Sequence, residues 1–168
     1  MVDKAQAKRV RAMAMALYDD AAPRRNGEIR RELGGACDLH ELGMMVSHHD
    51  HHRHSAYLLA HVDAPGFSQS QQRRLGALVL GQRGGLRKIE QSLVYEDFAW
   101  QVLCLRLGAI KCHARGDIDP TALTLKRSGA QATLSFAPGW ADSHPRTLHL
   151  LREEAEAWSR GGVLKLVL

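Results

Sequence analysis

The stretch His40-Glu41-Leu42-Gly43, followed four residues later by His48-His49-Asp50-His51-His52-Arg53-His54-Ser55-Ala56-Tyr57, is the most chemically dense part of this 168-residue chain. It holds six of the ten histidines. Imidazole binds metals, exchanges protons near neutral pH and, when charged, attracts phosphate. The rest of the sequence is therefore interpreted as a scaffold around this stretch.

His40 lies on the apolar face of a predicted helix that runs from an N-cap at Asn26 to about Leu42. Leu33, Ala36, Cys37 and His40 follow the spacing i, i+3, i+4, i+7, which places them on one buried face. A buried polar group without a partner costs about 1–3 kcal/mol. His40 is therefore expected to be hydrogen-bonded or ligated. Gly43 is expected to end the helix.

The apolar spacing elsewhere predicts mostly helices, with a change of period near the C-terminal end. Helices are expected over 3–19, from His51 or His52, after Ser68 and over 96–114, with a break at Pro23–Gly27. Alternation over 123–136 around Ser128-Gly129 predicts a hairpin, followed by a helix from Pro145 and a third strand within 163–168. The expected fold is mainly α, of the α+β type: a helical bundle over 1–116 and a small antiparallel β-sheet with a C-terminal helix over 117–168.

Composition favours an anionic partner and a reducing setting. The net charge is +5 and the pI is about 9.4, which suits phosphate chains or nucleotides. The three cysteines form no C-x-x-C pair, and Cys37 and Cys104 fall on apolar stripes, so buried thiols are expected. The sequence has no signal-peptide core and no apolar run of about 20 residues, so a cytoplasmic protein without a membrane partner is expected. A nucleic-acid partner is not favoured, because basic residues and aromatics do not interleave.

A histidine and a carboxylate at a helix end, with more histidines nearby, suit a divalent metal. The candidate ligands are His40, Glu41, His48, His52 and His54. The alternative is a hydrogen-bonded polar seam between helices, with His49 and His51 exposed.

Cationic side chains are concentrated in the same third of the chain. Arginine can bind two phosphate oxygens at once through bidentate hydrogen bonds, and lysine adds a point charge, so these residues could line a polyphosphate groove. The candidates are Arg53, His54, Arg73, Arg74, Arg83, Arg87 and Lys88. The alternative is an ordinary solvated basic surface. No nucleophile motif or P-loop is present, so no catalytic residue is assigned.

The run His52-Arg53-His54-Ser55-Ala56-Tyr57-Leu58-Leu59, with 39–43 and 63–68, resembles the C-terminal region of the exopolyphosphatase / guanosine pentaphosphate phosphohydrolase (Ppx/GppA) family. The resemblance extends over nearly the whole chain and implies an HD-like helical domain that binds polyphosphate and supports homodimer contacts. It also implies that hydrolysis, with Mg²⁺, belongs to N-terminal domains that this chain lacks. The sequence departs from the family pattern at Glu41, where Asp is usual, and at Gln82, where His is frequent.

Two hypotheses follow from these residues and the resemblance. The first is a non-catalytic module of an exopolyphosphatase-type protein, which binds polyphosphate or guanosine pentaphosphate within the full-length protein and supports dimerisation. The alternative is a self-sufficient metal-dependent HD-type phosphohydrolase that uses His40, Glu41, His48 and His54.

Overall fold

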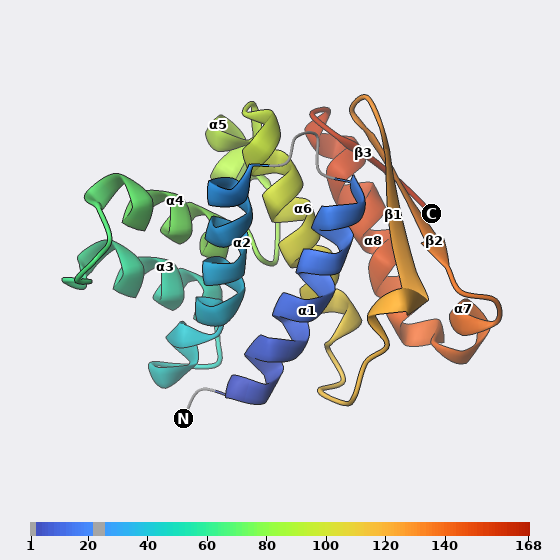
Figure 1. Ribbon diagram of the computed structural model, residues 1–168, viewed down its shortest axis with the longest axis horizontal. Helices are drawn as coiled ribbons and strands as arrows, with labels where there is room; N and C mark the ends of the chain where they lie inside the picture. The colour runs from blue at the N-terminus through green and yellow to red at the C-terminus, as the bar shows by residue number, and fades with distance from the viewer. Residues whose placement is uncertain (1–2, 22–25) are drawn as a thin grey trace.

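The computed structural model describes residues 3–21 and 26–168, in which α1 to α6 come before the sheet and α7 and α8 lie between its second and third strands (Figure 1). The predicted break at Pro23 lies outside the described residues. The α-helices are α1 Lys4–Ala21, α2 Gly27–Leu39, α3 His51–His61, α4 Gln69–Leu80, α5 Glu90–Leu93, α6 Glu96–Lys111, α7 Trp140–Ser143 and α8 Pro145–Gly161. The 3₁₀ turns are η1 Leu42–Met45, η2 Arg87–Ile89 and η3 Pro120–Ala122, and the strands are β1 Leu123–Ser128, β2 Gln131–Phe136 and β3 Lys165–Val167.

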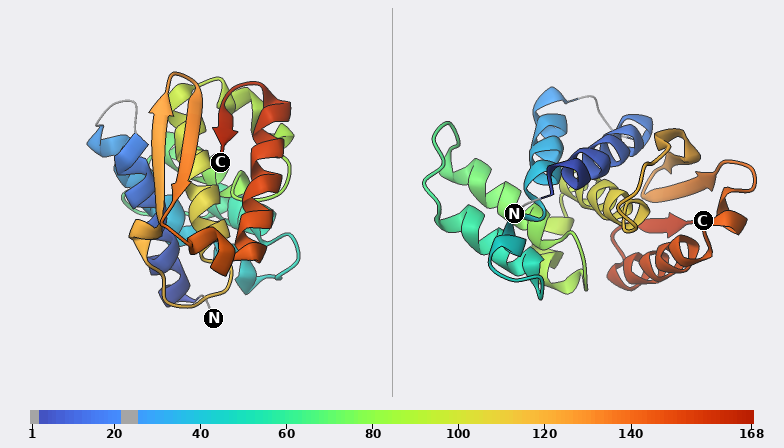
Figure 2. Two further views of the ribbon diagram at one scale, coloured as in Figure 1. Left: turned by 90° about the vertical axis from the view of Figure 1, so that its right-hand side faces the viewer. Right: turned by 90° about the horizontal axis from the view of Figure 1, so that it is seen from below.

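The helical core forms around α6, which is apolar on several faces. Its residues 98–108 are all buried, so this helix lies inside the molecule, as the sequence predicts. α1 packs on α6, on α2 and on β1. α3 and α4 form a pair at the end of the molecule opposite the sheet (Figure 2). The histidine-rich stretch therefore lies far from the sheet, at the start of α3.

Helix starts agree with the capping signals in the sequence. The side chain of Asn26 accepts hydrogen bonds from the amides of Glu28 and Ile29 at the start of α2. Ser68 and Gln71 form the complete capping box of α4. Leu33, Ala36, Cys37 and His40 are all buried, so the predicted inward face of α2 is confirmed.

The sheet has three strands in the order β1-β2-β3 and is mixed, which corrects the expected antiparallel sheet. β1 and β2 form the predicted hairpin, with Leu125 opposite Leu134. β3 pairs with β2 in parallel, with Leu166 beside Ala132. The reason is the connection: α8 crosses over between β2 and β3, and a helical crossover returns the chain in the same direction. Figure 2 shows α8 beside the three strands.

One cluster of buried apolar residues runs from the helices into the sheet, across the predicted boundary at residue 116. A buried ion pair also crosses it. Arg106 of α6 donates from Nε and Nη2 to the carboxylate of Glu154 on α8, at 2.6 and 2.8 Å. The Glu154 carboxylate also accepts from the indole N–H of Trp158 at 2.8 Å. These contacts fix α8 against the helical part.

Gly43 does not end α2, which stops at Leu39; it lies in η1 and is packed against α3. A Cβ at this position would overlap the backbone oxygen of His51 and the backbone nitrogen of Ser55. The glycine is required for close approach of two backbone segments, which is a different role from the predicted C-cap.

All three cysteines are buried free thiols, as the apolar stripes predict for Cys37 and Cys104. Burial raises the pKa of Cys37 to about 12 and that of Cys112 to about 11, so both stay protonated at neutral pH. In the described ranges, the helices lack either the length or the apolar character needed to cross a bilayer.

Candidate functional site

His40 lies just after α2, almost completely buried, and its ring is satisfied from within its own turn. Its Nδ1 donates to the carbonyl oxygen of Cys37 at 2.6 Å. Burial lowers the pKa of His40, so the neutral ring is favoured at neutral pH. Nε2 then carries the lone pair and lies 3.6 Å from Oε1 of Glu41. The expectation of a partnered inward histidine is confirmed.

Glu41 is buried and is held by Arg115, which follows α6. Nη2 of Arg115 donates to both carboxylate oxygens of Glu41, at 2.8 and 2.9 Å. Nη1 of Arg115 donates to Asp3 at 3.1 Å. Arg115 adopts the left-handed backbone conformation, with φ 55°, to make this bridge. The Glu41 charge is therefore balanced inside the protein.

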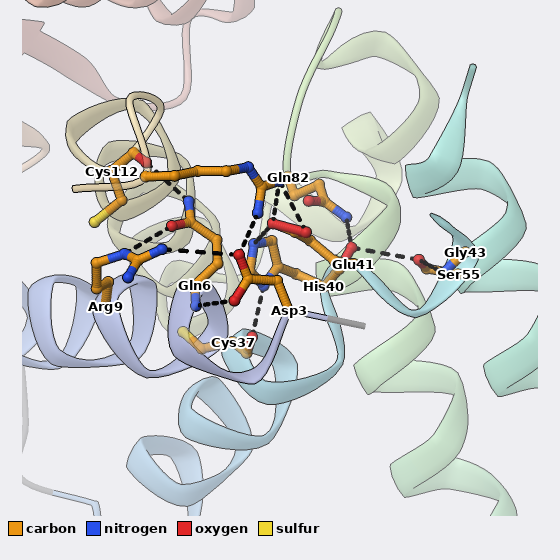
Figure 3. A network of polar contacts seen from close by, with 11 residues as sticks. Asp3, Gln6, Arg9, Cys37, His40, Glu41, Gly43, Ser55, Gln82 and Cys112 are labelled. Carbon is orange, nitrogen blue, oxygen red and sulfur yellow. Dashed lines mark hydrogen bonds and ion pairs between the residues drawn. The ribbon is translucent and has the colours of Figure 1, made fainter. Parts of the chain in front are cut away.

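The His40 carbonyl is a second meeting point of this network. It accepts from Nε2 of Gln82 at 2.6 Å and from the hydroxyl of Ser55 at 3.3 Å, and that hydroxyl accepts from the Gly43 amide at 2.6 Å. Figure 3 shows these contacts together with those around Asp3 and Glu41, made by residues at the start of α1, just after α2, on α3 and in the turn after α4. We call Asp3, His40, Glu41, Ser55, Gln82 and Arg115 the Glu41 network.

The five expected metal ligands are not drawn together. His48 is exposed before α3, His52 is buried on another side of α3, and Glu41 is occupied by Arg115. Across residues 3–21 and 26–168, no three His, Cys, Asp or Glu side chains are grouped so that they could hold a metal ion. In the structure His40 and Glu41 are parts of a hydrogen-bonded seam.

A cleft of about 610 Å³ lies between the Glu41 network and α8. Its walls include three arginines, Arg83, Arg106 and Arg115, and three glutamates, Glu41, Glu153 and Glu154. Two of these arginines are paired within the protein, with Glu154 and Glu41. Arg83, which is exposed at the rim, forms no ion pair with a described residue. The three arginines and three glutamates of the cleft wall are equal in number, and Arg83 is the arginine among them without an ion-pair partner in the described residues.

Arg83 belongs to a second group of charged side chains, which form no ion pair with a described residue, although the Lys88 ammonium donates a hydrogen bond to the Arg83 carbonyl oxygen. The pKa of Lys88 is lowered to about 8, first by burial and then by the nearby charges of Arg106, Arg53 and Arg83. Asp50 opposes this shift. Arg106 is neutralised by Glu154, so the free cations are Arg53, Arg83 and Lys88, which we call the Lys88 cluster.

The structure divides the seven predicted anion-binding residues. Arg53, Arg83 and Lys88 come together around the start of α3 and the turn after α4. Arg73 and Arg74 lie in the first half of α4, beside a separate hollow of about 430 Å³, and Arg74 is paired with Glu32 at 2.7 Å. Arg87 is exposed on η2, and His54 is half-buried on α3 near Gly43. Of these seven described residues, Arg53, Arg83 and Lys88 are the ones that lie together without ion-pair partners.

Sequence reasoning missed two arginines that organise this region. Arg106 could have been found, because a charged residue between Leu105 and Leu107 in the most apolar helix must have a buried partner. Arg115 left no such signal, since it lies in a polar turn and reaches Glu41 from far along the chain.

The comparison with protein families agrees with the resemblance seen in the histidine-rich stretch. A family model described as "Ppx/GppA phosphatase, domain III" matches residues 1–155, which include all the helices up to most of α8 and the β-hairpin. The match covers far more than half of the chain, and it includes both the Glu41 network and the Lys88 cluster. The chain therefore belongs to the Ppx/GppA phosphatase family, as its domain III.

Proposed function

We propose that this domain is a non-catalytic part of an exopolyphosphatase-type protein and that it binds inorganic polyphosphate through the Lys88 cluster. Family membership supports the exopolyphosphatase-type assignment. The observation that carries the binding proposal is the half-buried ammonium group of Lys88 near the exposed side chains of Arg53 and Arg83, and burial followed by these neighbouring charges lowers the pKa of Lys88 to about 8. Such an arrangement is unfavourable in the free protein and becomes favourable when an anion neutralises it.

Polyphosphate suits this cluster better than a single small anion does. Arg53 lies on α3, and Arg83 and Lys88 lie on the segment after α4, so the cations are spread over two elements. Each repeat of a phosphate chain carries about one negative charge, so neighbouring repeats can meet neighbouring cations. Arginine can bind two oxygens at once, and charge-assisted hydrogen bonds are stronger than neutral ones.

The test is binding of long-chain polyphosphate to the purified chain, measured by calorimetry at several salt concentrations. Affinity should fall as salt rises, because the contacts are between exposed charges. Arg53→Ala and Lys88→Ala should each weaken binding about tenfold, the size expected for one charge-assisted contact. Arg160→Ala, at the exposed end of α8, is the matched control and should bind like the wild type. Absence of binding, or equal loss in all three variants, would refute the proposal.

Self-association is a second proposal, and exposed apolar side chains favour it. Val94 and Tyr95 are adjacent and each is 69% exposed. Tyr95 lines the same hollow as Ile29 and Phe98. We propose this face as a homodimer contact. Sedimentation velocity should show a dimer that Tyr95→Ser weakens and that Tyr57→Ser, an exposed control on α3, leaves intact; a monomeric wild type would exclude it.

A further inference from the structure

The first turn of α3 offers backbone donors that the protein itself does not use. Asp50 precedes the helix with φ 52°, and its side chain makes no capping hydrogen bond. The backbone amides of Arg53 and His54 both donate to the Asp50 carbonyl. The amides of His51 and His52, which precede them, have no acceptor in the described part of the chain. The positive end of the helix dipole is therefore uncapped.

A buried side chain without a partner lies in the same turn. His52 is only 5% exposed, and its Nδ1 has no hydrogen-bond partner among the residues described. Leaving a buried polar atom unpaired costs about 1–3 kcal/mol, so a hydrogen bond from this atom to a ligand would be favourable. His51 has an unpaired Nδ1 too, but it lines the cleft beside His40, whereas His52 feels the charges of Lys88 and Arg83.

The ring of His52 is neutral at neutral pH. Burial, followed by the charges of Lys88 and Arg83, lowers its pKa to about 4. A neutral imidazole has one N–H, which can be on either nitrogen. An anion placed at Nδ1 would select the tautomer that donates there. The His52 ring and the amides of His51 and His52 belong to the same helical turn, and the charges of Lys88 and Arg83 act on this ring.

We propose that the start of α3 binds one phosphate group that has three free oxygens: the end of a polyphosphate chain or inorganic phosphate. This inference rests on the proposed function for the chain-end case, because the Lys88 cluster would hold the neighbouring repeats. A terminal group carries three free oxygens for the donors. An interior repeat carries two, and both of its bridging oxygens must continue as chain, which the buried position of His52 obstructs.

The first experiment compares polyphosphate of two lengths, with free ends and with ends blocked as phosphoramidates, on the complete wild-type chain. End binding predicts the same affinity per chain for both lengths and about a tenfold loss on blocking, the size of one charge-assisted contact. Affinity that follows the number of phosphate repeats, with no effect of blocking, would overturn the inference while leaving the proposed function intact.

The second experiment follows the ring nitrogens of His52 by NMR while inorganic phosphate is added, with chloride at equal ionic strength as the reference. A phosphate-specific shift supports the site, and it identifies free phosphate as the ligand if polyphosphate does not bind at all. His52→Gln should remove the preference for free ends and keep the salt-sensitive binding. His149→Gln, exposed on α8, is the matched control. If neither a shift nor a preference for ends is seen, the inference fails.

Discussion

The Glu41 network and the Lys88 cluster are neighbours, since Arg83 lines the same cleft as Glu41 and Arg115, but they differ in how their charges are paired. In the Glu41 network each buried polar group meets a partner, and the Glu41 carboxylate is neutralised by Arg115. In the Lys88 cluster burial lowers the pKa of Lys88 first, and the neighbouring like charges lower it further. The difference separates structure from binding: paired polar groups fix the fold, whereas unpaired cations are available for an anion.

The largest effect is expected from breaking the buried ion pair between α6 and α8, in which the charges of Arg106 and Glu154 are paired like those of Glu41 and Arg115. Glu154→Ala leaves Arg106 buried without its counter-charge, which should cost about 3–5 kcal/mol of unfolding free energy. Urea denaturation measures the loss. Glu153→Ala, an exposed neighbour, should unfold like the wild type. Equal stability of the two variants would show that the buried pair is not needed.

Packing between the network and α3 is tested by Gly43→Ala. The new methyl group would overlap the backbone of His51 and Ser55, so the two segments must separate, at an expected cost of about 3 kcal/mol. Thermal unfolding checks this. Gly85→Ala, where a Cβ meets open space, serves as the control and should keep the melting temperature.

The Glu41 bridge can be broken with a change of one side chain. Glu41→Ala removes two hydrogen bonds to Arg115 and should lower the unfolding free energy by about 1–3 kcal/mol. It should leave polyphosphate binding unchanged, because Lys88 and its neighbours are untouched. If the variant lost polyphosphate binding but kept normal stability, Glu41 would belong to the binding site and would not act as a structural residue.

The pKa of Lys88 predicts how binding depends on pH. In the free protein this pKa is about 8, below the ordinary value for lysine, so Lys88 loses its proton as the pH rises through 8. A bound anion raises the pKa, so binding takes up a proton, and affinity should fall above pH 8 by about tenfold. Calorimetry in two buffers of different ionisation enthalpy measures the proton uptake. Lys88→Ala should abolish the pH dependence.

The smallest effect is expected for Arg53→Ala in the free protein. Arg53 is exposed and has no ion pair with a described residue, so its removal should change the unfolding free energy by no more than about 0.5 kcal/mol. Chemical denaturation of wild type and variant gives the value. A loss of several times that size would mean that Arg53 has a structural partner and does not belong with the free cations.

Local signals predicted most of the fold, because they act over a few residues. The sequence pattern predicted the caps at Asn26 and Ser68, the buried face that ends at His40 and the hairpin after residue 122, and the structure contains all of them. The direction of β3 and the role of Gly43 depend on segments that meet only in the folded chain, and the sequence pattern missed both.

The candidate site was less predictable than the fold. A histidine-rich stretch shows that chemistry is present, but which side chains are neutralised depends on distant residues such as Arg115. Arg53, Arg83 and Lys88 were among the predicted anion-binding residues, and no feature of their sequence context distinguished them from Arg73 and Arg74. Only the ion pair of Arg74 with Glu32 and the position of α4 separate the two groups.

The packing of α1 on both α6 and β1 has a consequence for synthesis on the ribosome. The inner face of α1, with Val10, Met13 and Leu17, is completed only when residues 96–128 have emerged, and α2 covers just one side before that. At about 5–20 residues per second, the wait of roughly 100 residues lasts on the order of 5–20 s. During that time an apolar helix remains partly uncovered, so nascent chains paused before β1 should be the form that chaperones bind.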